Sequence, residues 1–129
     1  MSDAVHFILD ESALLAAGYG NVMASGLIHR SAEVSGWYVH VPVCALVEAD
    51  RRRPGTAEHF ASLPGITVLE LDLPAALALA RETTWADAHT RYAAAPTPER
   101  PDGAVIATTA PDKWRGAHVR VLDLSPDAP

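Results

Sequence analysis

The sequence predicts an α/β fold, a three-layer α/β/α sandwich with a mostly parallel central sheet. Short apolar runs that suit buried strands alternate with helical segments along the whole chain. The 129 residues are enough for one domain with a substantial core, and 49% of them are hydrophobic. We therefore expect a single domain over residues 1–124 and a disordered tail over residues 125–129.

Five stretches have the length and composition of strands: Val5–Leu9, Trp37–Val41, Ile66–Leu71, Ala104–Thr108 and Val119–Leu124. Glycine and proline separate the helical segments between them: Ser12–Ala17, Asn21–Val34, the segment after Pro42, Ala57–Leu63, Leu73–Thr83 and Trp85–Ala94. Pro42 suits the first turn of its helix. Thr84 and Asp87 have the spacing of a capping box, which predicts a helix start. The proline-rich segment Pro96–Gly103 is expected to be an exposed loop.

Charge and cysteine content narrow the class of protein. The chain carries 16 Asp and Glu against 10 Lys and Arg, a net charge of −6, which argues against a surface built for general nucleic-acid binding. A single cysteine, Cys44, excludes an internal disulfide framework and a multi-cysteine zinc site. No apolar run approaches the roughly 20 residues that cross a bilayer, and the acidic start does not suit a signal peptide. We expect a cytoplasmic protein without a membrane partner.

Four carboxylates fall at strand ends or on adjoining helices, where open α/β sheets bind ligands. Asp10 follows the first strand, and Glu48 lies within the helix after the second. Asp87 opens a later helix, and Asp112 follows the fourth strand. Each also has a purely structural interpretation, as an N-cap, a capping-box residue or a solvated helix residue. Their order along the chain favours a functional set.

With these four carboxylates in this order, the sequence resembles a PIN domain, the nuclease fold of the toxins in VapBC-type toxin–antitoxin pairs. The matching segments are FILDESALLA, VPVCALVEADR, ADAHTRYAAA, AVIATTAPDKW and VRVLDL, which run from about Val5 to Leu124. The resemblance implies a metal-dependent endoribonuclease that hydrolyses RNA phosphodiester bonds. Its partners would be RNA, an antitoxin protein and a second copy of the chain, with Val22, Met23 and Leu27 as a candidate dimer surface.

The resemblance also implies roles for individual residues. The catalytic carboxylates fall on Asp10, Glu48, Asp87 and Asp112, and the first three would be ligands of Mg²⁺ or Mn²⁺, which prefer oxygen. The chemistry implied is attack by a metal-bound water on the phosphate. The family's Ser or Thr falls on Ser12, a candidate RNA contact. Candidate RNA contacts that lie near the site by position are Lys113 and Arg115.

One part of the motif departs from the family pattern. The family usually has Thr-x-Asp at the end of the fourth strand, whereas here Thr108-Thr109-Ala110 is followed by Pro111 and Asp112. Asp112 is therefore displaced, and another register would place the third Asp on Asp102. The alternative interpretation is a catalytically degenerate PIN-like domain that acts as an RNA- or protein-binding module. A phosphoacceptor receiver domain is disfavoured because no Asp closes the third strand.

Overall fold

The computed structural model describes residues 4–125 and confirms the α/β architecture. In this part of the chain, one sheet holds five strands: β1 (Val5–Leu9), β2 (Trp37–Pro42), β3 (Ile66–Leu69), β4 (Val105–Thr108) and β5 (Arg120–Asp123). Their order is β3-β2-β1-β4-β5, and every neighbouring pair is parallel. Apart from Ser125, the expected tail lies outside the described residues.

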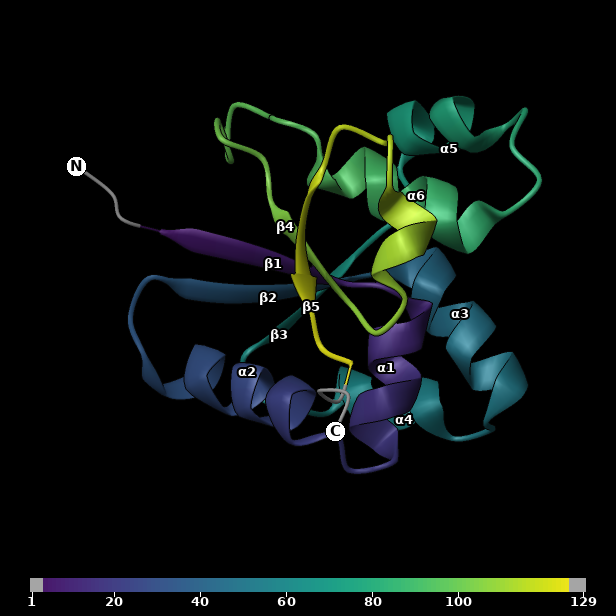
Figure 1. The fold of residues 1–129 in the computed structure, drawn as a ribbon. Helices are drawn as coiled ribbons and strands as arrows, with labels where there is room; N and C mark the ends of the chain where they lie inside the picture. The colour runs from purple at the N-terminus through teal and green to yellow at the C-terminus, as the bar shows by residue number, and fades with distance from the viewer. Residues whose placement is uncertain (1–3, 126–129) are drawn as a thin grey trace.

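Within the described residues, six α-helices and one 3₁₀ helix accompany the sheet: α1 (Glu11–Gly18), α2 (Val22–Glu33), α3 (Val43–Arg52), α4 (Thr56–Ala61), α5 (Leu73–Leu79), α6 (Trp85–Ala94) and η1 (Pro111–Trp114). Helices α1, α2 and α4 cover one face of the sheet, and α6, with α5 packed on it, covers the other (Figure 1). Helix α3 packs against both α1 and α6. The chain is therefore a three-layer α/β/α sandwich.

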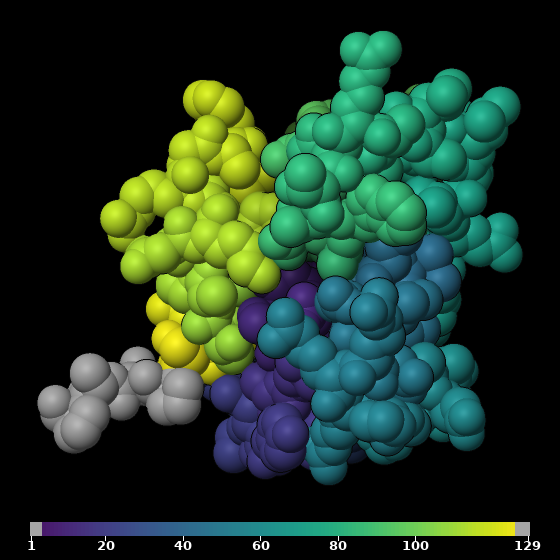
Figure 2. All heavy atoms as spheres, turned by 90° about the vertical axis from the view of Figure 1, so that its right-hand side faces the viewer, coloured from purple at the N-terminus to yellow at the C-terminus, as the bar shows by residue number. Residues whose placement is uncertain are grey.

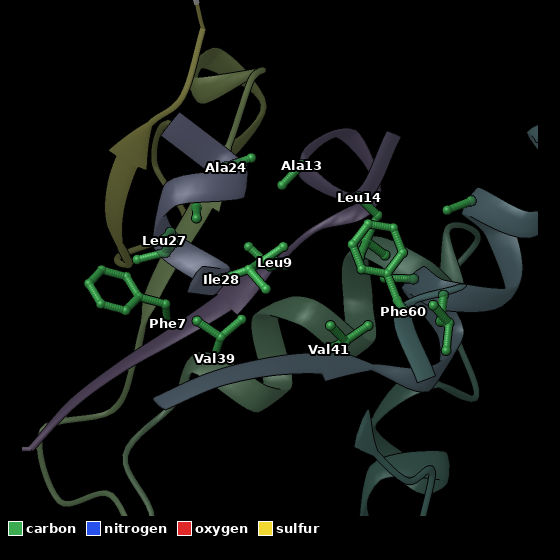
Figure 3. Close-up of a cluster of buried hydrophobic side chains, with 14 of the residues drawn as sticks. Phe7, Leu9, Ala13, Leu14, Ala24, Leu27, Ile28, Val39, Val41 and Phe60 are labelled. Atoms are coloured by element: carbon green, nitrogen blue, oxygen red, sulfur yellow. The ribbon is translucent and has the colours of Figure 1, made fainter. Parts of the chain in front are cut away.

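Alternation along β1 divides the interior into two cores. Phe7 and Leu9 point into the larger core, which helices α1, α2, α3 and α4 complete with Leu14, Leu27 and Phe60 among others (Figure 3). Ile8 points to the opposite face, toward α6 and η1. Because both faces of the central strands are covered, these strands read as continuous apolar runs. No helix within residues 4–125 is long and apolar enough to cross a bilayer.

Three local expectations are corrected. Pro42 is the last residue of β2 and the N-cap of α3, so it precedes the first helical turn instead of lying in it. Helix α5 ends at Leu79, well before Thr83, because the chain turns there: the Glu82 N–H donates to the Leu79 carbonyl. Leu27 is only 6% exposed and belongs to the core, which excludes it from a dimer surface, whereas Val22 and Met23 are exposed.

Candidate functional site

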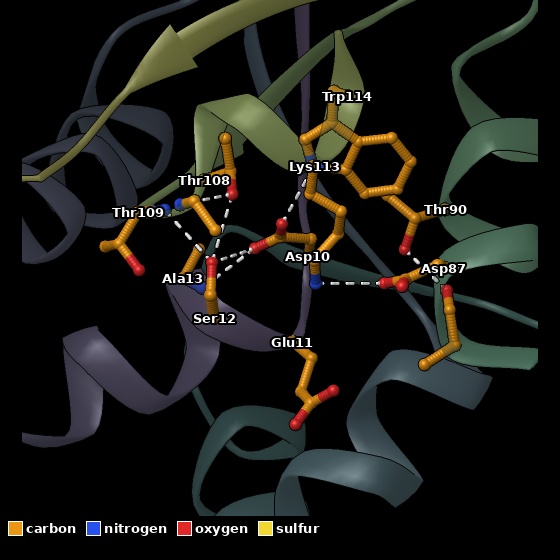
Figure 4. Close-up of polar contacts among 12 residues, drawn as sticks. Asp10, Glu11, Ser12, Ala13, Asp87, Thr90, Thr108, Thr109, Lys113 and Trp114 are labelled. Atoms are coloured by element: carbon orange, nitrogen blue, oxygen red, sulfur yellow. Dashed lines mark hydrogen bonds and ion pairs between the residues drawn. The ribbon is translucent and has the colours of Figure 1, made fainter. Parts of the chain in front are cut away.

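Asp10 lies at the carboxyl end of β1, at the point where the sheet order changes direction between β1 and β4. Its side chain is completely buried. It caps helix α1, because one carboxylate oxygen accepts hydrogen bonds from the Ala13 N–H at 2.9 Å and the Ser12 hydroxyl at 2.7 Å. The other oxygen accepts the indole N–H of Trp114 at 3.0 Å (Figure 4). Both oxygens therefore have donors within the chain.

Ser12 joins the ends of β1 and β4. Its hydroxyl hydrogen is donated to Asp10, so the Thr108 hydroxyl, 3.0 Å away, is the donor to the Ser12 oxygen. The same oxygen accepts the Thr109 N–H at 3.0 Å, and the Ala110 N–H donates to the Thr108 oxygen at 2.9 Å. This network fills the crevice in which a sheet of this type usually binds its ligand.

The open space lies beside this crevice, between α3 and α6. Figure 2 shows a hollow there, with atoms of the early, purple part of the chain on its floor. The cleft has a volume of about 690 Å³ and is lined by acidic, basic and apolar side chains. The acidic residues are Glu11, Glu48 and Asp87, and the basic residues are Arg51, Arg52 and Lys113. Two of the four predicted catalytic carboxylates, Glu48 and Asp87, therefore face one cavity.

Every charge of the cleft has a partner of opposite sign. Arg52 forms an ion pair with Glu11, Arg51 lies 3.7 Å from Glu48, and Lys113 lies 3.2 Å from Asp87. Asp87 was expected to close a capping box with Thr84, but the Thr84 side chain makes no capping hydrogen bond and Asp87 turns to Lys113 instead. The cleft is electrically balanced by its own side chains.

Glu11 is the cleft carboxylate that sequence reasoning missed. Its side chain is 12% exposed, and burial raises its pKa. The charges of Arg52 and Lys113 lower the same pKa, while those of Glu48 and Asp87 raise it further. The signal was present in the sequence, because Glu11 is the residue next to Asp10 and opens the same helix. Asp10 faces inward and Glu11 faces the cleft.

Three other predicted site residues lie apart from the carboxylates of the cleft. Asp112 and Arg115 form an exposed ion pair with each other at 2.5 Å, and their side chains are 82% and 80% exposed. Asp102 lies in the exposed turn before β4, where its backbone carbonyl accepts a hydrogen bond from Arg120. The structure does not bring Asp112 or Asp102 to the cleft.

His89 and Cys44 have a packing role at the wall of the cleft. Helix α3 begins without a side-chain cap, and the Cys44 N–H instead donates to His89 Nδ1 at 3.3 Å. Burial lowers the pKa of His89, which keeps its ring neutral and able to accept at neutral pH, while burial raises the pKa of the Cys44 thiol. Burial of His89 and the use of its Nδ1 as an acceptor disfavour a role as catalytic base, and the raised pKa of the Cys44 thiol disfavours a reactive thiolate.

The side chains do not fit a divalent metal in this arrangement. Within residues 4–125, no three His, Cys, Asp or Glu side chains are grouped so that they could hold a metal ion. Asp10, the expected central ligand, already uses both oxygens for hydrogen bonds. The cleft carboxylates of Glu11, Glu48 and Asp87 are each held by a cationic side chain.

The fold and the cleft define the class of protein: an α/β protein with a parallel sheet and a charge-balanced cleft near the carboxyl ends of its strands. No protein-family model, no curated protein and no solved structure matches this chain. The resemblance to PIN domains therefore stays a prediction, made from the sequence segments and from the order of the carboxylates along the chain.

Proposed function

We propose that the chain is a PIN-like domain that binds a segment of a partner protein in the cleft between α3 and α6. The observation that carries this proposal is the internal pairing of the cleft charges, Glu11 with Arg52, Glu48 with Arg51 and Asp87 with Lys113. RNA binding depends on cations that are free to neutralise phosphates. The three basic side chains of the cleft are already neutralised.

Apolar side chains at the cleft supply the driving force for such an interaction. Val47 is 53% exposed, Leu71 is 41% exposed and Trp85 is 65% exposed, and all three line the cleft. Exposed apolar groups surrounded by polar ones are typical of protein–protein contact sites. The partner segment would therefore combine apolar side chains with charges of both signs.

A displayed library of random peptides, selected on the full chain, tests the proposal. We expect selected peptides to lose at least about ten-fold in affinity for the Leu71→Ser variant, as expected for an apolar anchor. Leu77→Ser is the matched control, because Leu77 is 68% exposed on α5 and does not line the cleft. Equal losses in the two variants, or selective binding of structured RNA in place of peptides, would contradict the proposal.

A second candidate is the metal-dependent endoribonuclease of the toxin type that the sequence resemblance implies. The observation in its favour is that Glu11, Glu48 and Asp87 line one cavity and that the last two raise the pKa of the first. As such a toxin, the chain would pair with an antitoxin and form a cytoplasmic homodimer, with exposed Val22 and Met23 at the dimer surface.

Incubation of the protein with structured RNA and Mg²⁺ or Mn²⁺, with an EDTA control, tests this second candidate. Glu48→Gln is a suitable variant because Glu48 faces the cleft, whereas a change at fully buried Asp10 would act through folding. RNA cleavage that EDTA and Glu48→Gln both abolish would support the nuclease. RNA that stays intact, or that the variant cuts equally well, would exclude it.

A further inference from the structure

Lys113 is held firmly at the border between the buried network and the cleft. It lies in η1, where its N–H donates to the Ala110 carbonyl at 3.1 Å. The next residue, Trp114, is only 4% exposed and is anchored by its hydrogen bond to Asp10. The backbone of Lys113 is therefore fixed from both sides, and its side chain enters the cleft.

The ammonium group of Lys113 sits among the acidic groups. Its Nζ lies 3.2 Å from Asp87 Oδ1 and 5.9 Å from the centre of the Trp114 ring, within the range of a cation–π contact. Its charge also acts on Glu11, whose pKa it lowers. Figure 4 shows the Lys113 side chain running past Asp10 to reach Asp87. Two-thirds of the side chain is buried, since its exposure is 33%.

We propose that the Lys113 ammonium is a built-in counter-ion of the cleft and keeps divalent cations out of it. Repulsion between the three cleft carboxylates favours bound cations. Arg51 and Arg52 pair with Glu48 and Glu11 at one side of the cleft, and Lys113 adds a third internal positive charge beside Asp87, close enough to act on Glu11. A divalent ion would have to displace an ammonium that pairs with Asp87 and lies over the Trp114 ring. The inference does not depend on which partner segment the cleft binds, and it is incompatible with the metal-dependent nuclease named above as the second candidate.

Binding of Mn²⁺ to the full chain, measured by calorimetry and by the electron paramagnetic resonance signal of free Mn²⁺, tests the proposal. We expect Lys113→Met to bind Mn²⁺ at least about ten-fold more tightly than the wild-type protein, because one opposing charge at close range is removed. Adding Asp87→Asn to Lys113→Met should abolish this gain. Arg115→Met is the matched control, because it removes the same charge nearby from an ion pair outside the cleft.

The outcomes separate an effect of the Lys113 charge within the cleft from a general effect of removing a positive charge from the protein. Wild-type Mn²⁺ affinity equal to that of Lys113→Met, or an equal gain in Arg115→Met, would overturn the proposal. If circular dichroism shows that Lys113→Met is unfolded, Lys113→Gln gives the same measurement with a polar side chain. Lys113→Arg, which keeps the charge, should bind Mn²⁺ no better than the wild-type protein. Peptide affinity does not enter these measurements, so the proposed function can fail or succeed separately.

Discussion

The hydrogen bond between Trp114 and Asp10 is predicted to be one of the larger single contributions to the stability of this domain. Trp114→Phe keeps an aromatic ring in the second core and removes the N–H that satisfies Asp10 Oδ2. A hydrogen bond to a charged, buried group is worth about 1.5–3 kcal/mol, and the smaller ring adds a cavity cost of about 1 kcal/mol. We therefore expect the free energy of unfolding to fall by about 3 kcal/mol.

Urea denaturation measures this change as a lower midpoint with an unchanged slope. Trp85→Phe is the control, because Trp85 is 65% exposed and its indole N–H donates to the Glu82 carbonyl at the surface, so the expected loss is under about 1 kcal/mol. A double-mutant cycle with Asp10→Asn isolates the contact. Equal losses for the two tryptophan variants, or additive effects of Trp114→Phe and Asp10→Asn, would refute the reasoning.

Two further predictions concern the backbone and pH. Gly103 has φ 70°, and an added Cβ would lie 2.4 Å from the Ala94 carbonyl oxygen, so Gly103→Ala should lower the free energy of unfolding by about 2–4 kcal/mol in urea denaturation. Gly116→Ala, with φ 83° and open space around it, should cost about 1 kcal/mol; equal losses would contradict the steric argument. Burial and the charge of Arg100 lower the pKa of His40 to about 4. The unfolded chain therefore takes up a proton first as pH falls, and stability should drop by up to about 3 kcal/mol between pH 6.5 and 4 while staying level above that window. His40→Gln should remove most of that slope in urea titrations, and an unchanged slope would assign it to other groups.

Much of the fold was predictable because its signals are local. The strand β1 has the predicted bounds because an apolar run marks it in the sequence. Helix α6 also has the predicted bounds, with Thr84 as its N-cap residue, although the capping box that predicted its start does not form. Element ends that depend on tertiary contacts were not predictable. Helix η1 had no helical periodicity to reveal it, and its closing residue Trp114 is fixed by a contact with Asp10, 104 residues earlier in the chain.

The position of the candidate site in the fold was predictable from the sequence. The hydrogen-bond and ion-pair partners of its side chains were not. The sequence indicated that Asp10, Glu48 and Asp87 lie near the carboxyl edge of the sheet, and the last two do line the cleft. Spacing cannot distinguish Asp10 from Glu11, because both are acidic and lie next to each other at the start of one helix. They differ only in the folded chain, where Asp10 accepts the Trp114 indole N–H and Glu11 pairs with Arg52. Sequence reasoning therefore selected Asp10 and passed over Glu11.

Asp10 is buried and Glu11 lines the cleft, and this difference decides which variants can test the site. In sheets of this order, the crevice between β1 and β4 is the usual ligand position, but here hydrogen bonds from Ser12 and Trp114 to Asp10 fill it. A ligand in the adjacent cleft meets Glu11, whereas it would reach Asp10 only after that network had opened. Loss of activity or binding in an Asp10 variant would consequently report on the stability of the domain. A Glu11 variant, which leaves the cap of α1 in place, reports on the cleft itself.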